Sequence, residues 1–122
     1  MPDDASHENR ISALSALVDS FADERDWAKF HSPKNLAMAI AVEAAELMEI
    51  FQWADTAESA HLVTAKRAAI EEEVADVFAY LLRFCSLAGI DLPGALRAKV
   101  AVNAGKYPAD KVRGKSAKYN EY

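Results

Sequence analysis

Two pairs of acidic residues, each with its members three positions apart, could carry chemistry in this sequence. Glu43 and Glu46 form the first pair, and Glu73 and Asp76 form the second. A spacing of three places both carboxylates of a pair on one face of a helix. The other residues from 40 to 48 are all apolar. Carboxylates in such surroundings cost free energy unless a cation meets them.

The two pairs together predict a divalent cation. Consecutive helices with a short connection usually pack antiparallel, which would bring the four carboxylates into one cluster. Mg²⁺ prefers oxygen ligands, keeps several waters and commonly bridges protein carboxylates to substrate phosphates. We therefore predict that Glu43, Glu46, Glu73 and Asp76 bind Mg²⁺ and that the substrate carries phosphates. The plainer interpretation, two solvated acidic faces, suits the first pair poorly because its neighbours are apolar.

Polar and basic residues that could contact the phosphates lie further along the chain. Lys99 and Asn103 are four positions apart and so share a helical face, and Lys106 follows them. The alternative is a solvated basic helix end. Tyr80 lies four residues after Asp76, where its hydroxyl could reach the same zone, or it could be a core tyrosine with a buried hydrogen bond.

Aromatic residues flank the helix that carries the first acidic pair. Trp27 and His31 precede this helix, and Trp53 follows it. Nucleobases stack on such rings, so these residues are candidates for a base-binding pocket. The alternatives are aromatic rings that plug the core and a histidine that is only a polar loop residue.

The elements that must position these residues are all predicted to be helices. Apolar periodicity and capping signals such as Ser32-Pro33, Gly89 and Asp91 predict four helices. Their ranges are about 8–25, 33–53, 63–88 and 91–104. The polar stretch 55–61 lacks periodicity and is interpreted as a connection. The fold class is therefore all-α, of the four-helix-bundle type, with a domain over 1–108 and a basic, mobile tail over 109–122.

Composition narrows the possible partners. The 122 residues carry a net charge of −5, which is the wrong sign for a protein that grips nucleic acid nonspecifically. Cys85 is the single cysteine and cannot form an internal disulfide. The start of the chain lacks signal-peptide features, and no apolar run reaches the length of a membrane span. We expect a cytoplasmic protein with no nucleic-acid or membrane partner.

The order of these residues resembles the MazG-like all-α nucleotide pyrophosphohydrolases, and within them the dCTP pyrophosphatase branch. The resemblance covers about residues 20 to 110 and rests on these segments: Arg25-Asp26-Trp27, Phe30-His31, Pro33 with Asn35-Leu36, Glu43-x-x-Glu46-Leu47, Phe51-Gln52-Trp53, Glu72-Glu73-x-x-Asp76-Val77, Tyr80-Leu81, Asp91-Leu92-Pro93, Lys99 to Asn103 and Lys106-Tyr107-Pro108.

The resemblance implies an activity and assigns roles to residues. It implies hydrolysis of a nucleoside triphosphate, such as dCTP or a related or modified pyrimidine deoxynucleotide, to the monophosphate and pyrophosphate. It implies Mg²⁺ on the four acids, with Mn²⁺ as a substitute, and a water-orienting base that is either Glu43 or Glu46. Phosphate or sugar contacts fall to Tyr80, Lys99, Asn103 and Lys106, and the base pocket to Trp27, His31, Asn35 and Trp53. It also implies a homodimer or a homotetramer made of two dimers.

Two other hypotheses about the function stay open at this point. A di-iron carboxylate bundle also gathers acids, but that class expects Glu-x-x-His on two helices, and the single match here is Glu58-x-x-His61. A non-catalytic helical oligomerisation module would leave Glu43 and Glu46 without a role.

Overall fold

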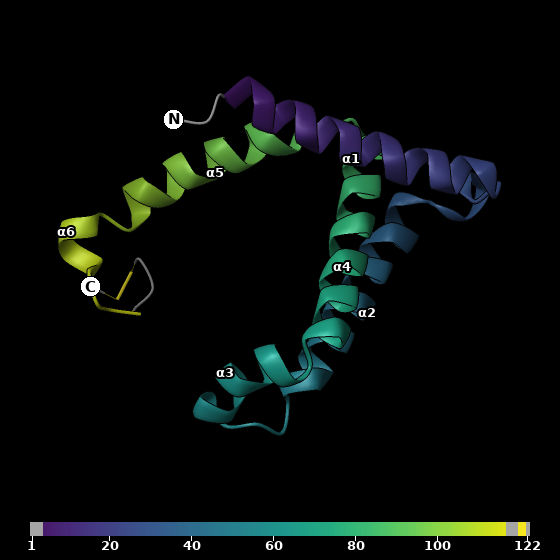
Figure 1. Ribbon diagram of the computed structural model, residues 1–122. Helices are drawn as coiled ribbons and strands as arrows, with labels where there is room; N and C mark the ends of the chain where they lie inside the picture. The colour runs from purple at the N-terminus through teal and green to yellow at the C-terminus, as the bar shows by residue number, and fades with distance from the viewer. Residues whose placement is uncertain (1–3, 117–119, 122) are drawn as a thin grey trace. The chain divides into compact units, whose positions relative to one another are not determined.

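The computed structural model describes residues 4–116 and 120–121, with side chains from residue 10 onward. Within these residues every regular element is helical, which confirms the all-α class. The elements, in chain order, are α1 (Asp4–Glu24), the short 3₁₀ helix η1 (Ala28–Phe30), α2 (Pro33–Phe51), α3 (Thr56–Ala65), α4 (Arg67–Ala88), α5 (Leu92–Lys106) and α6 (Ala109–Val112) (Figure 1).

The helices α2 and α4 form the central pair of the fold. They lie side by side and run in opposite directions, as the sequence predicted, with α1 packed on the end of α4 near Gly89 and α3 at the other end (Figure 1). The predicted start of α2 is confirmed, because the Ser32 hydroxyl accepts a hydrogen bond from the Asn35 backbone N–H at 3.1 Å and Pro33 follows. Gly89 ends α4 in the left-handed conformation, with φ 68°.

The segment after α2 differs from the prediction. Residues 55–61 were expected to be a connection, but α3 begins at Thr56, and the Asp55 carboxylate caps it by accepting a hydrogen bond from the Glu58 N–H at 2.8 Å. The chain breaks instead at Lys66, which has φ −116° and ψ 28°. The predicted helix over 63–88 is therefore two helices. The prediction was wrong because α3 mixes polar and apolar residues without a clear stripe, and neither Gly nor Pro marks the break.

The core of the described chain is small. Its buried apolar residues are Ala22, Leu36, Leu82 and Cys85, which come from α1, α2 and α4. The prediction that Cys85 is an ordinary core residue is confirmed, and burial raises the pKa of its thiol. A charged residue, Arg83, is buried beside them with 4% of its surface exposed. These residues fix the junction between α1 and the α2–α4 pair.

The chain divides into two compact units, residues 1–90 and 91–122. In the second unit, α5 begins where the Asp91 carboxylate accepts a hydrogen bond from the Gly94 N–H at 3.2 Å, as the capping signal predicted. The short helix α6 lies in the segment predicted to be a basic tail. The predicted domain division after residue 108 stays a prediction. In the part of the chain that the structure describes, no helix combines the length and apolar character needed to cross a bilayer.

Candidate metal centre and adjoining pocket

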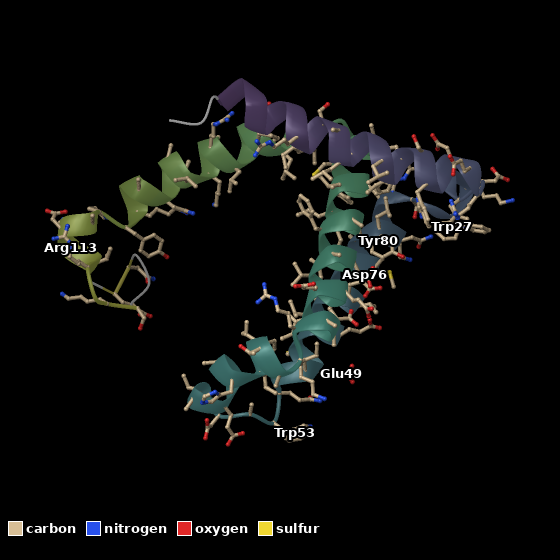
Figure 2. The ribbon with its side chains drawn as sticks, viewed as in Figure 1. Trp27, Glu49, Trp53, Asp76, Tyr80 and Arg113 are labelled. Atoms are coloured by element: carbon tan, nitrogen blue, oxygen red, sulfur yellow. The ribbon has the colours of Figure 1, made fainter. Side chains whose placement is uncertain are left out.

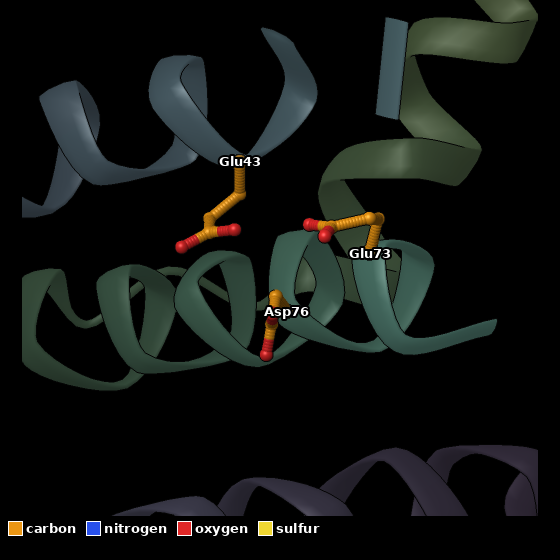
Figure 3. A group of neighbouring side chains, drawn as sticks. All are labelled: Glu43, Glu73 and Asp76. Carbon is orange, nitrogen blue, oxygen red and sulfur yellow. The ribbon is translucent and has the colours of Figure 1, made fainter. Parts of the chain in front are cut away.

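Three of the four predicted metal ligands come close together where α2 packs against α4. Glu43 extends from α2 toward α4, and Glu73 points into the space between the two helices (Figure 3). One carboxylate oxygen from each of Glu43, Glu73 and Asp76 lies within 4.8 Å of the others. The antiparallel pairing of the two helices makes this possible, since each acidic pair lies near the middle of its helix.

Two oxygens in this cluster are buried without a partner. Glu43 Oε2 and Glu73 Oε2 are both shielded from solvent and accept no hydrogen bond from the described residues. A buried carboxylate oxygen with no donor is costly, and in a native protein an ion or an ordered water is one explanation for such a group. Hard oxygen donors on two helices are the ligands that Mg²⁺ and Mn²⁺ take in proteins. The residues present therefore fit a divalent cation.

The electrostatics of the cluster lead to the same inference. The pKa of Glu43 is raised from 4.5 to about 7, first by desolvation and then by the neighbouring carboxylates of Glu46, Asp76 and Glu73. The pKa of Glu73 is raised by desolvation and by Glu46 and Asp76. Without a cation, ionising these carboxylates together costs free energy, because they are desolvated and repel one another. A divalent ion would reverse that preference and hold them deprotonated.

Glu46 lies at the edge of the cluster. Its side chain is exposed, and it is not one of the three residues whose oxygens lie within 4.8 Å of one another. It is still close enough to raise the pKa of both Glu43 and Glu73. Glu46 therefore lies on the solvent side of the three clustered carboxylates.

A pocket of about 210 Å³ adjoins the carboxylate cluster through Asp76. Trp27 and His31 line it from the segment between α1 and α2, and Tyr80 lines it from α4; the remaining lining residues are Val18, Phe21, Ala22, Ala79 and Arg83. Figure 2 shows Asp76 and Tyr80 on successive turns of α4, on the way to Trp27. The volume is below that of pockets for drug-sized ligands and suits a single ring system.

The aromatic wall of this pocket is held by ring contacts. Trp27 packs edge-on against Phe21 with 5.5 Å between ring centroids, and against His31 with 6.4 Å. The Arg25 guanidinium lies over the Phe21 ring, 3.7 Å from its centroid, in a cation–π contact. Trp27 and His31, predicted for the base pocket, are thus brought together with Tyr80, which was predicted for phosphate or sugar.

Two other residues predicted for the base pocket lie outside its lining. The Asn35 side-chain amide donates a hydrogen bond to the Phe30 carbonyl at 3.0 Å, so Asn35 ties the loop that carries His31 to the start of α2. Trp53 is 90% exposed and follows α2, at the α3 end of the pair, whereas Trp27 lies at the α1 end (Figure 2). The 19 residues of α2 separate them by about 28 Å. One chain therefore cannot place both tryptophans in one pocket.

The predicted phosphate ligands in the second unit share one helix. Lys99, Asn103 and Lys106 all lie on α5, and the Asn103 carbonyl accepts the hydrogen bond from Tyr107 that ends this helix, at 2.7 Å. Their assignment to the substrate stays a prediction.

Sequence reasoning missed an ionic network behind the pocket. Arg83 donates hydrogen bonds to His31 Nδ1 at 3.1 Å and to Asp19 Oδ1 at 2.7 Å, and Ser86 donates to Asp19 Oδ2 at 2.6 Å. The available signal was a single arginine inside the apolar run from 81 to 85 and a single aspartate directly after Leu17 and Val18. Charges at such positions are rarely buried unless they are paired.

The fold and the site together define an all-helical protein whose antiparallel central helices hold a carboxylate cluster suited to a metal ion. Residues 38–122 match the MazG-like family. The chain belongs to this family. It is 39% identical over 118 residues to human dCTP pyrophosphatase 1 and 38% identical to the rat enzyme of the same name, which covers 95% of this chain and 69% of each relative.

A solved structure shares the architecture. A pyrophosphatase from Archaeoglobus fulgidus superposes with a TM-score of 0.79 at 41% sequence identity, over 81% of this chain and 93% of that one. The two proteins are therefore similar in sequence as well as in helical arrangement.

Proposed function

We propose that this chain hydrolyses dCTP or a related pyrimidine deoxynucleoside triphosphate, with Mg²⁺ held by the carboxylate cluster. The chain is a nucleoside triphosphate pyrophosphohydrolase, because it belongs to the MazG-like family and closely resembles dCTP pyrophosphatases and a further pyrophosphatase. The observation that carries the finer proposal is the pair of unpartnered oxygens on Glu43 and Glu73, next to a ring-sized pocket that shares Asp76. A nucleoside triphosphate has two parts that match these features: its phosphates would bind the cation held by the carboxylates, and its base would fill the pocket.

The reaction proposed for this site is attack of water on the α-phosphorus. The bond from that phosphorus to the bridging oxygen of the β-phosphate breaks, and the products are the nucleoside monophosphate and pyrophosphate. Glu43, Glu73 and Asp76 would hold Mg²⁺, with Glu46 beside them, and the bound ion would supply neutralisation of phosphate charge and a lowered pKa for water. Either Glu43 or Glu46 orients the water and takes its proton. Lys99 and Lys106 are proposed to offset the charge on pyrophosphate.

The pocket is proposed to receive the base. Trp27 and Tyr80 offer ring faces and edges for stacking, and His31 offers a polar group beside them.

The di-iron hypothesis gains no support, since the three residues that cluster among those described are Glu43, Glu73 and Asp76, with no histidine. Glu58 and His61 lie on α3 and are not members of this group. The cytoplasmic location expected from the sequence stays a prediction.

A product assay tests the proposed function. The purified chain is incubated with dCTP and MgCl₂, and nucleotide products are separated and quantified together with pyrophosphate. We expect dCMP and pyrophosphate in equal amounts, loss of turnover with EDTA and recovery with added Mg²⁺. dTTP, dUTP, dATP, CTP and 5-methyl-dCTP, run as initial rates, define the base and sugar preference. Release of dCDP and orthophosphate, or no turnover of any triphosphate, would contradict the proposal.

We further propose that the active form is a homo-oligomer. The first unit buries few apolar side chains, yet Met38, Val42 and Met48 on α2 are each more than half exposed, and Trp53 is 90% exposed. Met38 and Val42 share a face of α2. A chain of this length normally buries about two-thirds of its surface, so a second copy is the natural cover for this face. It could also bring its own Trp53 to the base pocket, which one chain cannot do.

Sedimentation equilibrium tests the oligomer. The wild-type chain should sediment as a dimer or a tetramer, and Val42→Glu should shift it toward monomers because a charge would enter the apolar interface. Ala60→Glu, which adds the same charge to an exposed position on α3, is the control and should leave the mass unchanged. A monomeric wild type at micromolar concentration would overturn the proposal.

A further inference from the structure

The network behind the pocket has no role in the reaction described above. Arg83 is one of the most buried side chains in the first unit, with 5% of its side chain exposed, and it forms an ion pair with Asp19 on α1. Asp23 lies further away, at 3.9 Å from Nη2. A buried ion pair is weak support for stability as such, because desolvation offsets much of the attraction. Its geometry suggests a different purpose.

The contact between Arg83 and His31 fixes the proton on the imidazole ring. The guanidinium Nε carries a hydrogen and has no lone pair to offer, so it can only donate. It donates to His31 Nδ1 at 3.1 Å. Nδ1 must therefore be unprotonated, and the proton of the neutral ring is on Nε2. Arg83 cannot turn away, because its Nη1 is held by Asp19 at 2.7 Å and Asp19 is held in turn by Ser86.

The same arrangement keeps the ring neutral. Protonation at Nδ1 would place an N–H against the Nε–H of Arg83 and a second positive charge beside the guanidinium. Desolvation and the charge of Arg83 accordingly lower the pKa of His31. His31 lines the pocket together with Trp27 and Tyr80, so the ring nitrogen left for a ligand is Nε2, as a neutral donor.

We propose that Arg83, held by Asp19, is a positioning residue that locks His31 as the Nε2–H tautomer and so makes it a hydrogen-bond donor to an acceptor atom of the substrate ring. The carbonyl oxygen of a pyrimidine is an acceptor of this kind. The part that concerns the substrate rests on the proposed function, whereas the tautomer is a property of the protein alone. Neither Arg83 nor His31 belongs to the carboxylate cluster of Glu43, Glu73 and Asp76, so the effect should fall on substrate binding rather than on the chemical step.

The test removes the lock without leaving an unpaired buried charge. In the double variant Asp19→Asn/Arg83→Met both charges are lost together. The expected result is a KM for dCTP raised roughly three- to tenfold, the effect of losing one well-placed hydrogen bond, with kcat changed by less than about twofold. Arg67→Met/Glu71→Gln removes an exposed ion pair with a 2.9 Å contact on the same helix and should leave KM unchanged.

Nuclear magnetic resonance reads the tautomer directly. In ¹⁵N-labelled protein, the His31 ring should show an unprotonated Nδ1 and a protonated Nε2; His31→Asn identifies its signals among those of the three histidines. In the double variant the two tautomers should mix. Asp19→Asn/Arg83→Gln is the second variant if Asp19→Asn/Arg83→Met unfolds: it also removes both charges but keeps polar groups at both positions, and because a glutamine amide can accept as well as donate, it should also release the tautomer.

A thermodynamic cycle separates positioning from general damage. In a His31→Ala background, adding Asp19→Asn/Arg83→Met should raise KM no further, because Arg83 acts through His31. An equal rise in KM with and without His31, or an unchanged His31 tautomer in both arginine variants, would overturn the proposal. If the wild-type chain hydrolysed no triphosphate, the proposed function would fail while the tautomer measurement would still decide the role of Arg83.

Discussion

Glu43→Gln should lose pyrophosphohydrolase activity by roughly a hundredfold or more while the protein remains folded. The substitution removes one negative charge from the cluster and keeps the shape of the side chain. Glu43 is proposed as a metal ligand and as one of two candidates for the base, and loss of a general base alone typically costs ~10²–10⁴ in rate. Asp76→Asn should behave in the same way, because Asp76 contributes an oxygen to the same group.

The stability of these variants should move in the opposite direction from their activity. Desolvation and three neighbouring carboxylates raise the pKa of Glu43 to about 7, so its ionised form is a burden on the metal-free fold. Relieving such a strained site commonly stabilises a protein at the expense of function. Thermal melts in EDTA should therefore show an unfolding temperature equal to or above that of the wild type.

Matched measurements decide between a ligand and a merely structural acid. Glu71→Gln changes an acid on α4 that is exposed and paired with Arg67, and it should keep wild-type kcat and KM. Saturating Mg²⁺ should stabilise the wild type but not Glu43→Gln against heat, since a ligand that binds only the folded state raises its stability. Full activity in either Glu43→Gln or Asp76→Asn would refute the ligand assignment.

The part of this site that the sequence predicted is the part governed by helical periodicity. The spacing of three within each acidic pair, and the apolar residues around Glu43, were enough to predict that two helices face each other with carboxylates between them. The pocket residues Trp27 and His31 were predicted because they flank α2, whose start is fixed by Ser32 and Pro33. Local rules of this kind act within a few residues and can be read from one sequence.

The features that the sequence did not predict are of two kinds. One depends on contacts between residues that are distant in sequence, and the other is a helix break that no Gly or Pro signals. Arg83 and Asp19 are 64 positions apart, and neither charge predicts the other. The break at Lys66 has no Gly or Pro, and beyond it α3 packs against α4. Trp53 was grouped with Trp27 because both lie next to α2, but the length of that helix places them at opposite ends.

The raised pKa of Glu43 also predicts how metal binding depends on pH. The metal binds the deprotonated carboxylate, so protons compete with it wherever Glu43 is protonated in the metal-free protein. With a pKa of about 7, the apparent affinity for Mg²⁺ should be nearly constant above about pH 8 and fall roughly tenfold between about pH 8 and pH 6. The raised pKa of Glu73 adds to this fall. Calorimetric titrations in buffers of different ionisation enthalpy measure both the affinity and the protons released.

The stability of the metal-free protein should show the reciprocal effect. The folded-state pKa of Glu43, about 7, exceeds its ordinary value of 4.5, so between these values the folded state binds more protons than the unfolded state. Unfolding free energy therefore rises as the pH is lowered from about 7 toward 4.5, and the cost of the ionised group is fully present above pH 7. Denaturant melts in EDTA at several pH values should show this gain in the wild type and a smaller one in Glu43→Gln. A wild-type protein that loses stability over the same interval, with Mg²⁺ affinity independent of pH, would show that Glu43 ionises freely and that the cluster is not the strained site described above.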